Sequence, residues 1–331
     1  MAHMKKIATL GMTLAMVVSI LPATAMADTP SKTGWVKESG KWYYYDGYGK
    51  KVKYGSAYDP DSGKMYVTDS KGARVTKAGW YTSKYKMSEY YNKCKFTTKY
   101  YLKKGGEVTT GWKKIGKKYY FFNYQGEMSK GVPEYKDKNG KSVLYLLGND
   151  GARITKKGWH QVTYKYFESW SGYTRSYKSW YYVKTDGTLQ TGWKKLKGKY
   201  YYFGDSGSMY YDTAVEMFDK DGNVSKVYVV DKNGVRITKK GWIKVTHKWS
   251  YRYSDGVSTD KSTYYYYLKS DGTAKIGLKQ IKGKYYYFND DGIMRRNSTY
   301  TDSKNGIRYY FGKSGACTRT EKIKYDQSCW S

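Results

Sequence analysis

Aromatic residues recur at a fixed spacing, and they are the residues of this chain best suited to binding chemistry. A Gly-Trp or Gly-Leu pair precedes an aromatic run that starts seven residues after the Trp or Leu. Exposed Trp and Tyr rings attract cations through their π faces and present flat apolar surfaces to sugars. A repeated frame predicts binding surfaces built many times over rather than one catalytic centre. The four copies begin at Gly34, Gly111, Gly192 and Gly277.

Residues for acid–base, nucleophilic or metal chemistry form no recognisable motif. Most acidic residues lie in turn sequences beside Gly, where they shape the backbone, and no pair stands out as the two carboxylates of a glycosidase. His160 and His247 have no nucleophile or metal-binding partner nearby in sequence. Asp219 begins a calcium-like loop, but Val224 and Val230 replace the Gly and Glu of an EF-hand, which favours a hairpin turn. We therefore expect no catalytic residues, no metal and no cofactor.

The elements that must position the rings read as short strands separated by turns. Tyr, Trp, Val and Thr dominate the strand-like segments, and no apolar period of 3.6 residues appears beyond the N-terminal segment. Asn-Gly and Asp-Gly pairs permit the positive φ of tight hairpins. These pairs are Asn139-Gly140, Asp150-Gly151, Asp186-Gly187, Asn233-Gly234, Asp271-Gly272 and Asp291-Gly292.

A longer period of about 80 residues holds three hairpin signatures in each copy. The second hairpin ends in a recurring phrase of the type Gly-Ala-Arg-Val-Thr-Lys, at Gly72, Gly151 and Gly234. An isolated hairpin is marginal in water, so stacking on its neighbours must stabilise each one. The pattern predicts an all-β protein, an elongated β-solenoid of stacked β-hairpins. The expected super-repeats span residues 32–110, 111–191, 192–276 and 277–331.

The third hairpin of each super-repeat is longer than the others. These segments begin at Gly79, Gly158 and Gly241, and the last two show alternating aromatic residues along two arms. We expect turns near Trp170-Ser171-Gly172 and at Asp255-Gly256. Alternation favours three protruding hairpin ribbons over the alternative of wide loops.

Residues 1–27 resemble a leader rather than part of the fold. Two lysines precede an apolar stretch, and Ala25-Met26-Ala27 is typical of a cleavage site, so we expect a tag remnant and signal peptide, with residues 28–331 forming the repeat array. A transmembrane reading is weaker because no charged flank follows. No second apolar stretch exists, so we expect an exported mature chain without a membrane span.

The formal net charge of +33 favours anionic polymers as partners. The alternative is a solvated cationic surface that only keeps the protein soluble. Charge and aromatic residues together also suit single-stranded nucleic acid, but an export signal argues against that partner. Cys94, Cys317 and Cys329 are an odd set for an oxidising compartment. A bridge between Cys317 and Cys329 could close the last hairpin, and the fate of Cys94 stays open.

The frames that begin at Gly111 and Gly192 both contain Gly-Trp-Lys-Lys followed by Lys-Tyr-Tyr. They resemble the cell-wall-binding repeats of Gram-positive bacteria. That family includes choline-binding modules, glucan-binding repeats of glucansucrases and receptor-binding repeats of clostridial toxins. The resemblance implies a β-solenoid of stacked hairpins. It also implies a binding role at the cell surface or on an extracellular glycan.

The family's choline site is a box of aromatic rings, and the resemblance carries that box onto positions of this chain. The fourth copy departs from the pattern, with Leu278 in place of Trp, and the other three copies all have Tyr where the first has Trp42. Stacking on sugar rings needs less than a complete box. The implied ligand-binding groups are Trp35 with Trp42 and Trp80, Trp112 with Tyr119 and Trp159, and Trp193 with Tyr200 and Trp242.

Together these features predict a secreted, non-catalytic protein on the surface of a Gram-positive bacterium. Its expected partners are cell-wall polysaccharide, teichoic acid or extracellular glucan. The alternative is an outward-facing adhesin or effector that binds a host glycan or protein through the long aromatic hairpins. The sequence leaves the oligomeric state open.

Overall fold

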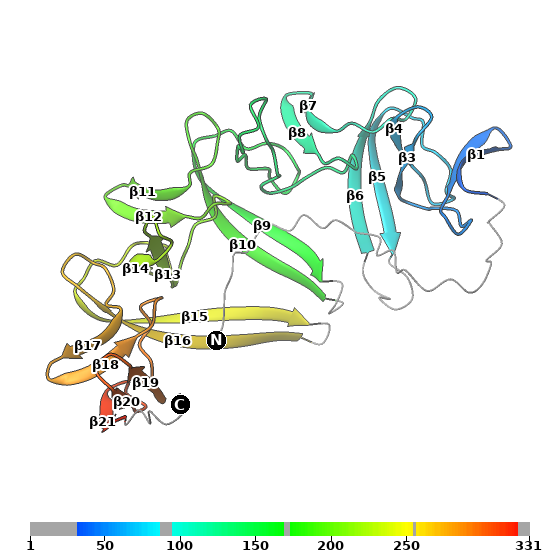
Figure 1. The fold of residues 1–331 in the computed structure, drawn as a ribbon. Helices are drawn as coiled ribbons and strands as arrows, with labels where there is room; N and C mark the ends of the chain where they lie inside the picture. The colour runs from blue at the N-terminus through cyan, green and yellow to red at the C-terminus, as the bar shows by residue number, and fades with distance from the viewer. Residues whose placement is uncertain (1–31, 87–94, 169–172, 254–255, 324–331) are drawn as a thin grey trace, which may run out of the picture. The chain divides into compact units, whose positions relative to one another are not determined.

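The computed structural model describes residues 32–86, 95–168, 173–253 and 256–323. Over these residues the chain forms twenty-one strands and no α-helix, so the predicted all-β class is confirmed (Figure 1). The strands form nine two-stranded sheets and one three-stranded sheet, and every named pair is an antiparallel neighbour in sequence. No helix that could cross a bilayer occurs among the described residues.

The Gly-Trp and Gly-Leu frames form the short hairpins. In each one the Trp or Leu lies opposite the third residue of the aromatic run, as in the pair Trp35 and Tyr44. The last residue of each run points inward, and Phe122, Phe203 and Phe288 are completely buried. The four hairpins are β1 (Gly34–Glu38) with β2 (Lys41–Tyr45), β7 (Gly111–Ile115) with β8 (Lys118–Phe122), β11 (Gly192–Leu196) with β12 (Lys199–Phe203), and β17 (Gly277–Ile281) with β18 (Lys284–Phe288).

The second hairpins are less uniform. The copy across residues 131–147 has only the isolated bridges Gly131–Leu147 and Lys136–Ser142, so the prediction of a strand pair in every copy is wrong there. Pro133 lies between the bridged positions and has no N–H to donate to a ladder. The regular copies are β3 (Ser56–Asp59) with β4 (Lys64–Val67), β13 (Thr213–Phe218) with β14 (Val224–Val230), and β19 (Ser298–Asp302) with β20 (Ile307–Phe311) and β21 (Cys317–Lys322).

The third hairpins are the long ones, and the prediction of three ribbons is confirmed (Figure 1). The longest keeps one register from the pair Gly241–Leu268 to the pair Tyr253–Gly256. The expected turn at Trp170-Ser171-Gly172, as well as Asp255, Cys94 and Cys329, lies outside the described residues. The ribbons are β5 (Gly79–Lys86) with β6 (Lys95–Leu102), β9 (Gly158–Glu168) with β10 (Tyr173–Val183), and β15 (Gly241–Tyr253) with β16 (Gly256–Leu268).

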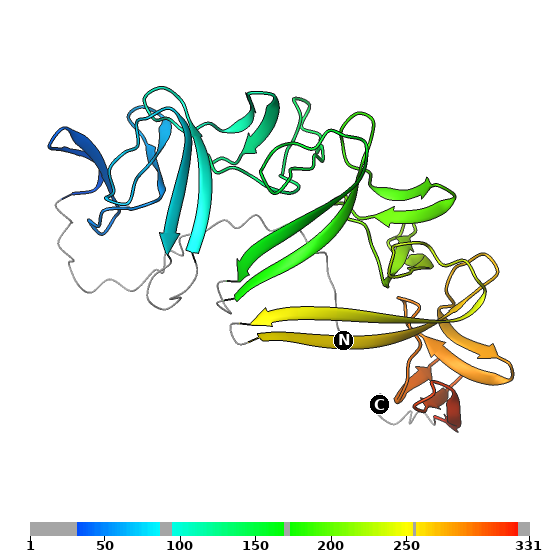
Figure 2. The same cartoon turned by 180° about the vertical axis from the view of Figure 1, so that it is seen from behind.

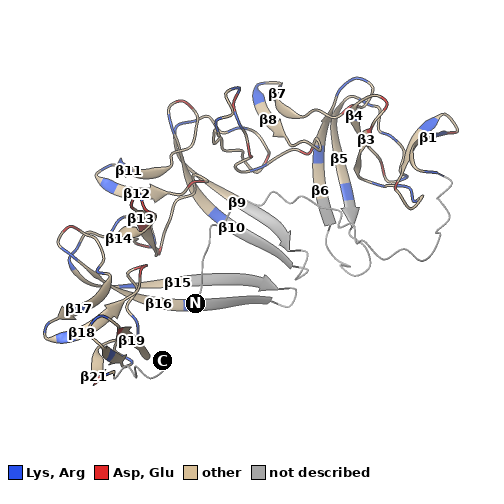
Figure 3. Cartoon of the chain, viewed as in Figure 1, with Lys and Arg blue, Asp and Glu red and all other residues tan. Residues whose placement is uncertain are grey.

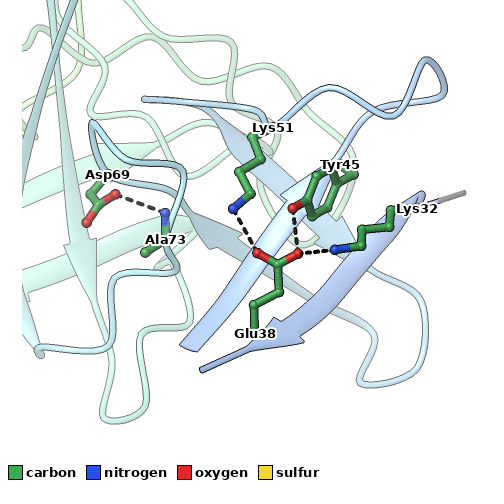
Figure 4. Close-up of polar contacts among 6 residues, drawn as sticks. All are labelled: Lys32, Glu38, Tyr45, Lys51, Asp69 and Ala73. Carbon is green, nitrogen blue, oxygen red and sulfur yellow. Dashed lines mark hydrogen bonds and ion pairs between the residues drawn. The ribbon is translucent and has the colours of Figure 1, made fainter. Parts of the chain in front are cut away.

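Gly occupies the fourth position of the turns, and in several of them, such as those that begin at Asp69 and Asp219, the first position is Asp or Asn. The Asp69 carboxylate accepts the backbone N–H of Lys71 at 2.8 Å and that of Ala73 at 2.9 Å, and Figure 4 shows the second bond. The Gly72 N–H donates to the Asp69 carbonyl. Gly72 has φ of 81°, which L residues with a side chain adopt only under strain. The calcium-like sequence at Asp219 forms this same turn, as predicted.

After each second strand the chain turns back, and one residue of the returning segment hydrogen-bonds to the preceding hairpin. Met294 N–H donates to the carbonyl of Tyr265 at 2.8 Å, although Tyr265 belongs to the previous ribbon. These bonds join consecutive hairpins through their backbones, which makes the repeats a stacked array. Equivalent donor–acceptor pairs are Arg74 to Trp42, Val108 to Met65, Met128 to Lys99, Arg153 to Tyr119, Arg236 to Tyr200 and Ala274 to Val227.

Contacts divide the chain into two compact units, and each contains at least two small cores. Figure 2 shows the strand pairs from behind. Unit 1 holds the described residues up to 164 and residues 176–189, and unit 2 holds residues 165–168, 173–175 and those from 190 onward. A typical core in unit 2 joins Val227 and Val229 of a second hairpin to Tyr266 and Leu268 of the next ribbon. Burial is therefore shared between neighbouring hairpins, which explains how strands too short to fold alone are stabilised.

Candidate functional site: filled and open aromatic clusters

The Trp of each short hairpin packs against a Tyr or Phe of its own hairpin and a Tyr of the next one. In the first copy Trp35 contacts Tyr44 and Tyr66 edge-on, with ring centroids 5.3 and 5.9 Å apart. The guanidinium carbon of Arg74 lies 3.2 Å from the centre of the Tyr66 ring. The chain thus places a cation of its own on this aromatic surface.

The same arrangement recurs in the next two super-repeats. The Arg153 guanidinium lies 3.9 Å from the Tyr145 ring centre and 5.8 Å from that of Trp112. Arg236 lies 4.1 Å from Tyr228 and 5.9 Å from Trp193. We call these three sets the filled clusters, and their members are Trp35, Tyr66 and Arg74; Trp112, Tyr145 and Arg153; and Trp193, Tyr228 and Arg236.

The arginines of the filled clusters are fixed by the backbone around them. Arg74 donates to the carbonyl of Gly105 at 3.0 Å, and Arg236 donates to that of Asp271 at 2.9 Å. The Nε atoms of Arg74, Arg153 and Arg236 are buried without a hydrogen-bond acceptor. A guanidinium is weakly hydrated and stacks on rings, so it tolerates this position better than an ammonium group would. The filled clusters are therefore suited to joining hairpins.

The Trp residues of the long ribbons lie in a different environment. Trp80 is 45% exposed and contacts Tyr101, Tyr120 and Phe122 at 5.4, 5.0 and 5.9 Å between ring centroids. Among the described residues, no Lys or Arg lies over its indole ring. A Trp face that is held by other rings yet open to solvent can stack on an apolar ligand surface.

Trp242 repeats this geometry in unit 2. It is 43% exposed and contacts Tyr267, Tyr286 and Phe288 at 5.2, 4.9 and 6.0 Å. Trp80 and Trp242 with their ring neighbours are the open clusters. Trp159, the third ribbon Trp, is 37% exposed and contacts Trp180 and Tyr182 of its own hairpin.

A cavity of about 390 Å³ adjoins the Trp242 open cluster. Trp242, Tyr265, Tyr286 and Met294 line it, and all four belong to unit 2. Arg296, Lys313 and Ser314 also line it, and the Arg296 guanidinium lies 4.9 Å from the centre of the Tyr265 ring. The cavity therefore combines an aromatic wall with positive charge.

The sequence-derived groups are not those that the fold assembles. Trp35 has its ring contacts with Tyr44 and Tyr66, whereas Trp80 contacts rings of its own and the following hairpin. The register is the reason, because it places the Trp opposite the third aromatic residue of the run rather than the first. The first residues, Trp42, Tyr119 and Tyr200, lie opposite Lys37, Lys114 and Lys195 and are 41%, 45% and 40% exposed.

Sequence reasoning missed several members of the clusters. These are the second-hairpin tyrosines, the arginines that cover them, and the cavity residues Tyr286, Met294, Arg296 and Lys313. A signal was present, since one position of a Lys-rich chain repeatedly holds Arg, and Arg stacks on rings more readily than Lys.

Lys and Arg recur along the described strands and turns (Figure 3). Most of these described side chains form no ion pair with an acidic group. The strongest described set surrounds Glu38, which binds Lys32 at 2.6 Å and Lys51 at 2.8 Å and accepts the Tyr45 hydroxyl at 2.6 Å (Figure 4). Hydrogen bonds from these groups lower the pKa of Glu38 to about 2. The Glu38 carboxylate therefore stays ionised, and its ion pair with Lys32 connects that residue to the first hairpin.

In unit 2 the pKa of Glu216, which lies beside Asp291, is shifted upward, opposite to the shift of Glu38. Glu216 on β13 is half-buried, and desolvation, a hydrogen bond with Asp291 and the nearby charge of Asp290 raise its pKa to about 7. The charges of Asp291 and Glu216 also reach Tyr266, whose pKa is raised mainly by burial. Among the described residues, no group of three or more His, Cys, Asp or Glu is arranged to hold a metal ion.

We expect the stability of unit 2 to fall as pH rises from about 4.5 to 7. The folded state binds the Glu216 proton more tightly than the unfolded chain does, in which Glu has a pKa of 4.5. The stabilisation from this proton is therefore fully present below pH 4.5, and it is lost as the pH rises through about 7. Solvent screening limits the loss to about 1 kcal/mol. Urea unfolding across this pH range measures it, and Glu216→Gln should remove the dependence; an unchanged pH profile in that variant would contradict the assignment.

Comparison with known proteins identifies the repeats. Residues 33–50, 110–128 and 191–209 match the model of the putative cell wall binding repeat, and residues 275–321 match that of the choline-binding repeat. These four segments are similar to cell-wall-binding and choline-binding repeats. The three shorter matches coincide with the Gly-Trp hairpins and their returning turns, and the longer match covers the Gly-Leu hairpin and most of the sheet β19-β20-β21.

Relatives of these repeats occur in larger proteins. Glucosyltransferase-S of Streptococcus mutans is 26% identical over 277 residues, which is 84% of this chain but only 16% of that protein's length. Among solved structures, CbpJ of Streptococcus pneumoniae is 21% identical and covers 87% of this chain and 94% of its own, with a TM-score of 0.34. Choline binding protein F of the same species, solved with a peptidoglycan analogue, is 23% identical over 87% of this chain and 92% of its own, with a TM-score of 0.33.

Proposed function

We propose that this chain is a secreted, non-catalytic protein of a Gram-positive cell surface that binds wall polysaccharide, teichoic acid or extracellular glucan. The observation that carries the proposal is the pair of open clusters, in which Trp80 and Trp242 present a solvent-exposed indole held by three other rings. The relatives support it, because one is named a glucosyltransferase and another was solved with a peptidoglycan analogue.

The role of each surface follows from its geometry. An exposed indole stacks on the C–H face of a pyranose ring, and each such contact is weak by itself. Repetition along one polymer raises the effective concentration of the second contact, so weak copies add up to useful avidity. Unpaired Lys and Arg residues attract phosphate- or carboxylate-bearing polymers, and added salt weakens that attraction.

Replacing both open-cluster tryptophans should weaken polymer binding. We expect Trp80→Ala with Trp242→Ala to reduce co-sedimentation with purified Gram-positive cell walls by about tenfold or more, because two stacking surfaces on one polymer are lost together. For the unaltered chain, binding should also fall between about 0.05 and 0.5 M NaCl, over which the Debye length shrinks several-fold.

Tyr48→Ala is the matched control, since Tyr48 is 93% exposed in a turn and makes no described ring contact. It should retain binding. The proposal is wrong if the unaltered chain does not sediment with walls, teichoic polymers or α-glucan. Equal binding by the double variant would show that the open clusters are not the binding surface. Release of sugar or peptide from these polymers would contradict the non-catalytic assignment.

A further inference from the structure

We infer that the cavity beside Trp242 binds a sugar unit that carries a negatively charged substituent, a phosphate or a carboxylate. The inference rests on the proposed function and narrows it for one copy of the repeat. It depends on three observations. The cavity has an aromatic wall, and two cations lie beside that wall. The turn at its edge is also more positively charged than the equivalent turn of the Trp80 copy.

The wall is suited to the apolar face of a ring. Trp242 and Tyr286 meet edge-on at 4.9 Å, so they form two sides of an angle, and Met294 lies buried beside them. Met294 is fixed by its backbone bond to Tyr265 and by contact with Gly315, where an added Cβ would come within 2.5 Å of its sulfur. Met294 is thus packed in place before a ligand arrives, which lowers the entropic cost of binding at this part of the wall.

The cations make the cavity a poor site for a bare ammonium ion. Arg296 and Lys313 line it, none of the residues lining it is acidic, and no described carboxylate pairs with either cation. Both side chains are exposed. A ligand with an anionic group satisfies these donors while its ring covers the aromatic wall.

Comparison with the Trp80 copy shows that the other open cluster lacks this charge. Met128 contacts Gly151 as Met294 contacts Gly315, so the two turns are equivalent. The residues before Gly151 are Asn149 and Asp150, and Asp150 forms an ion pair with Lys118 at 2.9 Å. The residues before Gly315 are Lys313 and Ser314. The last copy therefore gains a cation and loses an acid at one edge of its aromatic cluster.

Titration with small probes tests the inference on the intact chain. Glucose 6-phosphate, glucose, inorganic phosphate and choline are each added while the Trp242 indole N–H resonance is followed by NMR, with the resonance assigned from Trp242→Phe. Glucose 6-phosphate should bind at least about tenfold more tightly than glucose or phosphate alone, because a charged hydrogen bond and ring stacking act together. Glucuronate should behave likewise if a carboxylate substitutes for phosphate.

Two substitutions separate the cavity from general charge. Lys313→Asn should weaken binding of glucose 6-phosphate by about tenfold, whereas Lys232→Asn, at the equivalent turn position before Gly234, should leave it unchanged. Backbone spectra confirm that both variants are folded. Equal affinity for glucose, tighter binding of choline, equal affinity for phosphate alone, or no binding at all would each overturn the inference. Wall binding by the intact chain would still stand in those cases, because co-sedimentation measures it separately.

Discussion

Replacing Arg236 by alanine is expected to lower the free energy of unfolding of unit 2 by about 2–4 kcal/mol. Its guanidinium lies 4.1 Å from the Tyr228 ring centre and 5.9 Å from that of Trp193, and it donates to the carbonyl of Asp271 at 2.9 Å. The variant loses a cation–π contact and a charge-assisted hydrogen bond together. It also leaves the Asp271 carbonyl without this donor. Urea denaturation followed by Trp fluorescence measures the change.

Two further variants make this result specific. Arg295→Ala removes an exposed guanidinium that forms no described ion pair or ring contact, and it should change stability by less than about 0.5 kcal/mol. Arg236→Lys keeps the charge but loses the planar guanidinium. Its loss of unfolding free energy should therefore lie between those of Arg236→Ala and Arg295→Ala. If Arg236→Ala unfolds at the same urea concentration as Arg295→Ala, the filled clusters do not join the hairpins as we describe.

Gly234→Ala is expected to destabilise unit 2 by about 2–4 kcal/mol. Gly234 has φ of 76°, and a Cβ there would lie 2.6 Å from the Met209 methyl group and 2.9 Å from the backbone oxygen of Tyr210. The side chain can move, but the carbonyl belongs to the segment that returns toward the neighbouring hairpin. The substitution therefore adds overpacking to backbone strain.

Gly222→Ala is the matched control. Its φ of 81° imposes the same backbone strain, but an added Cβ would have open space around it. We expect a loss of about 1–2 kcal/mol from strain alone. Thermal unfolding of both variants gives the difference, which reports the close contact between the turn and the neighbouring segment. Equal losses would show that this contact is not tight.

The sequence predicted the hairpins because their determinants are local. The Gly-Trp frames, the turns and the three long ribbons follow from residues a few positions apart, such as Asp69 and Gly72. The irregular hairpin at residues 131–147 was missed, although Pro133 was visible and weakens any strand there. The hydrophobic pattern alone predicted a regular strand pair in that copy, which the structure lacks.

The clusters could not be predicted in the same way because they depend on how hairpins stack. Trp35 meets Tyr66, which lies on another hairpin, and the choice of partner depends on a register that repeat spacing does not reveal. The recurring Arg was visible as a repeat, but its position over a ring required coordinates. The distinction between filled and open clusters therefore emerges only from the structure.

Fluorine NMR of the chain labelled with 5-fluorotryptophan tests the central claim most directly. Each resonance is assigned by a single Trp→Phe substitution, and solubilised wall polysaccharide is then added. The resonances of Trp80 and Trp242 should shift or broaden, because their indoles are exposed in open clusters. Those of Trp35, Trp112 and Trp193, which belong to the filled clusters, should stay in place. Perturbation of the second set without the first would contradict the account.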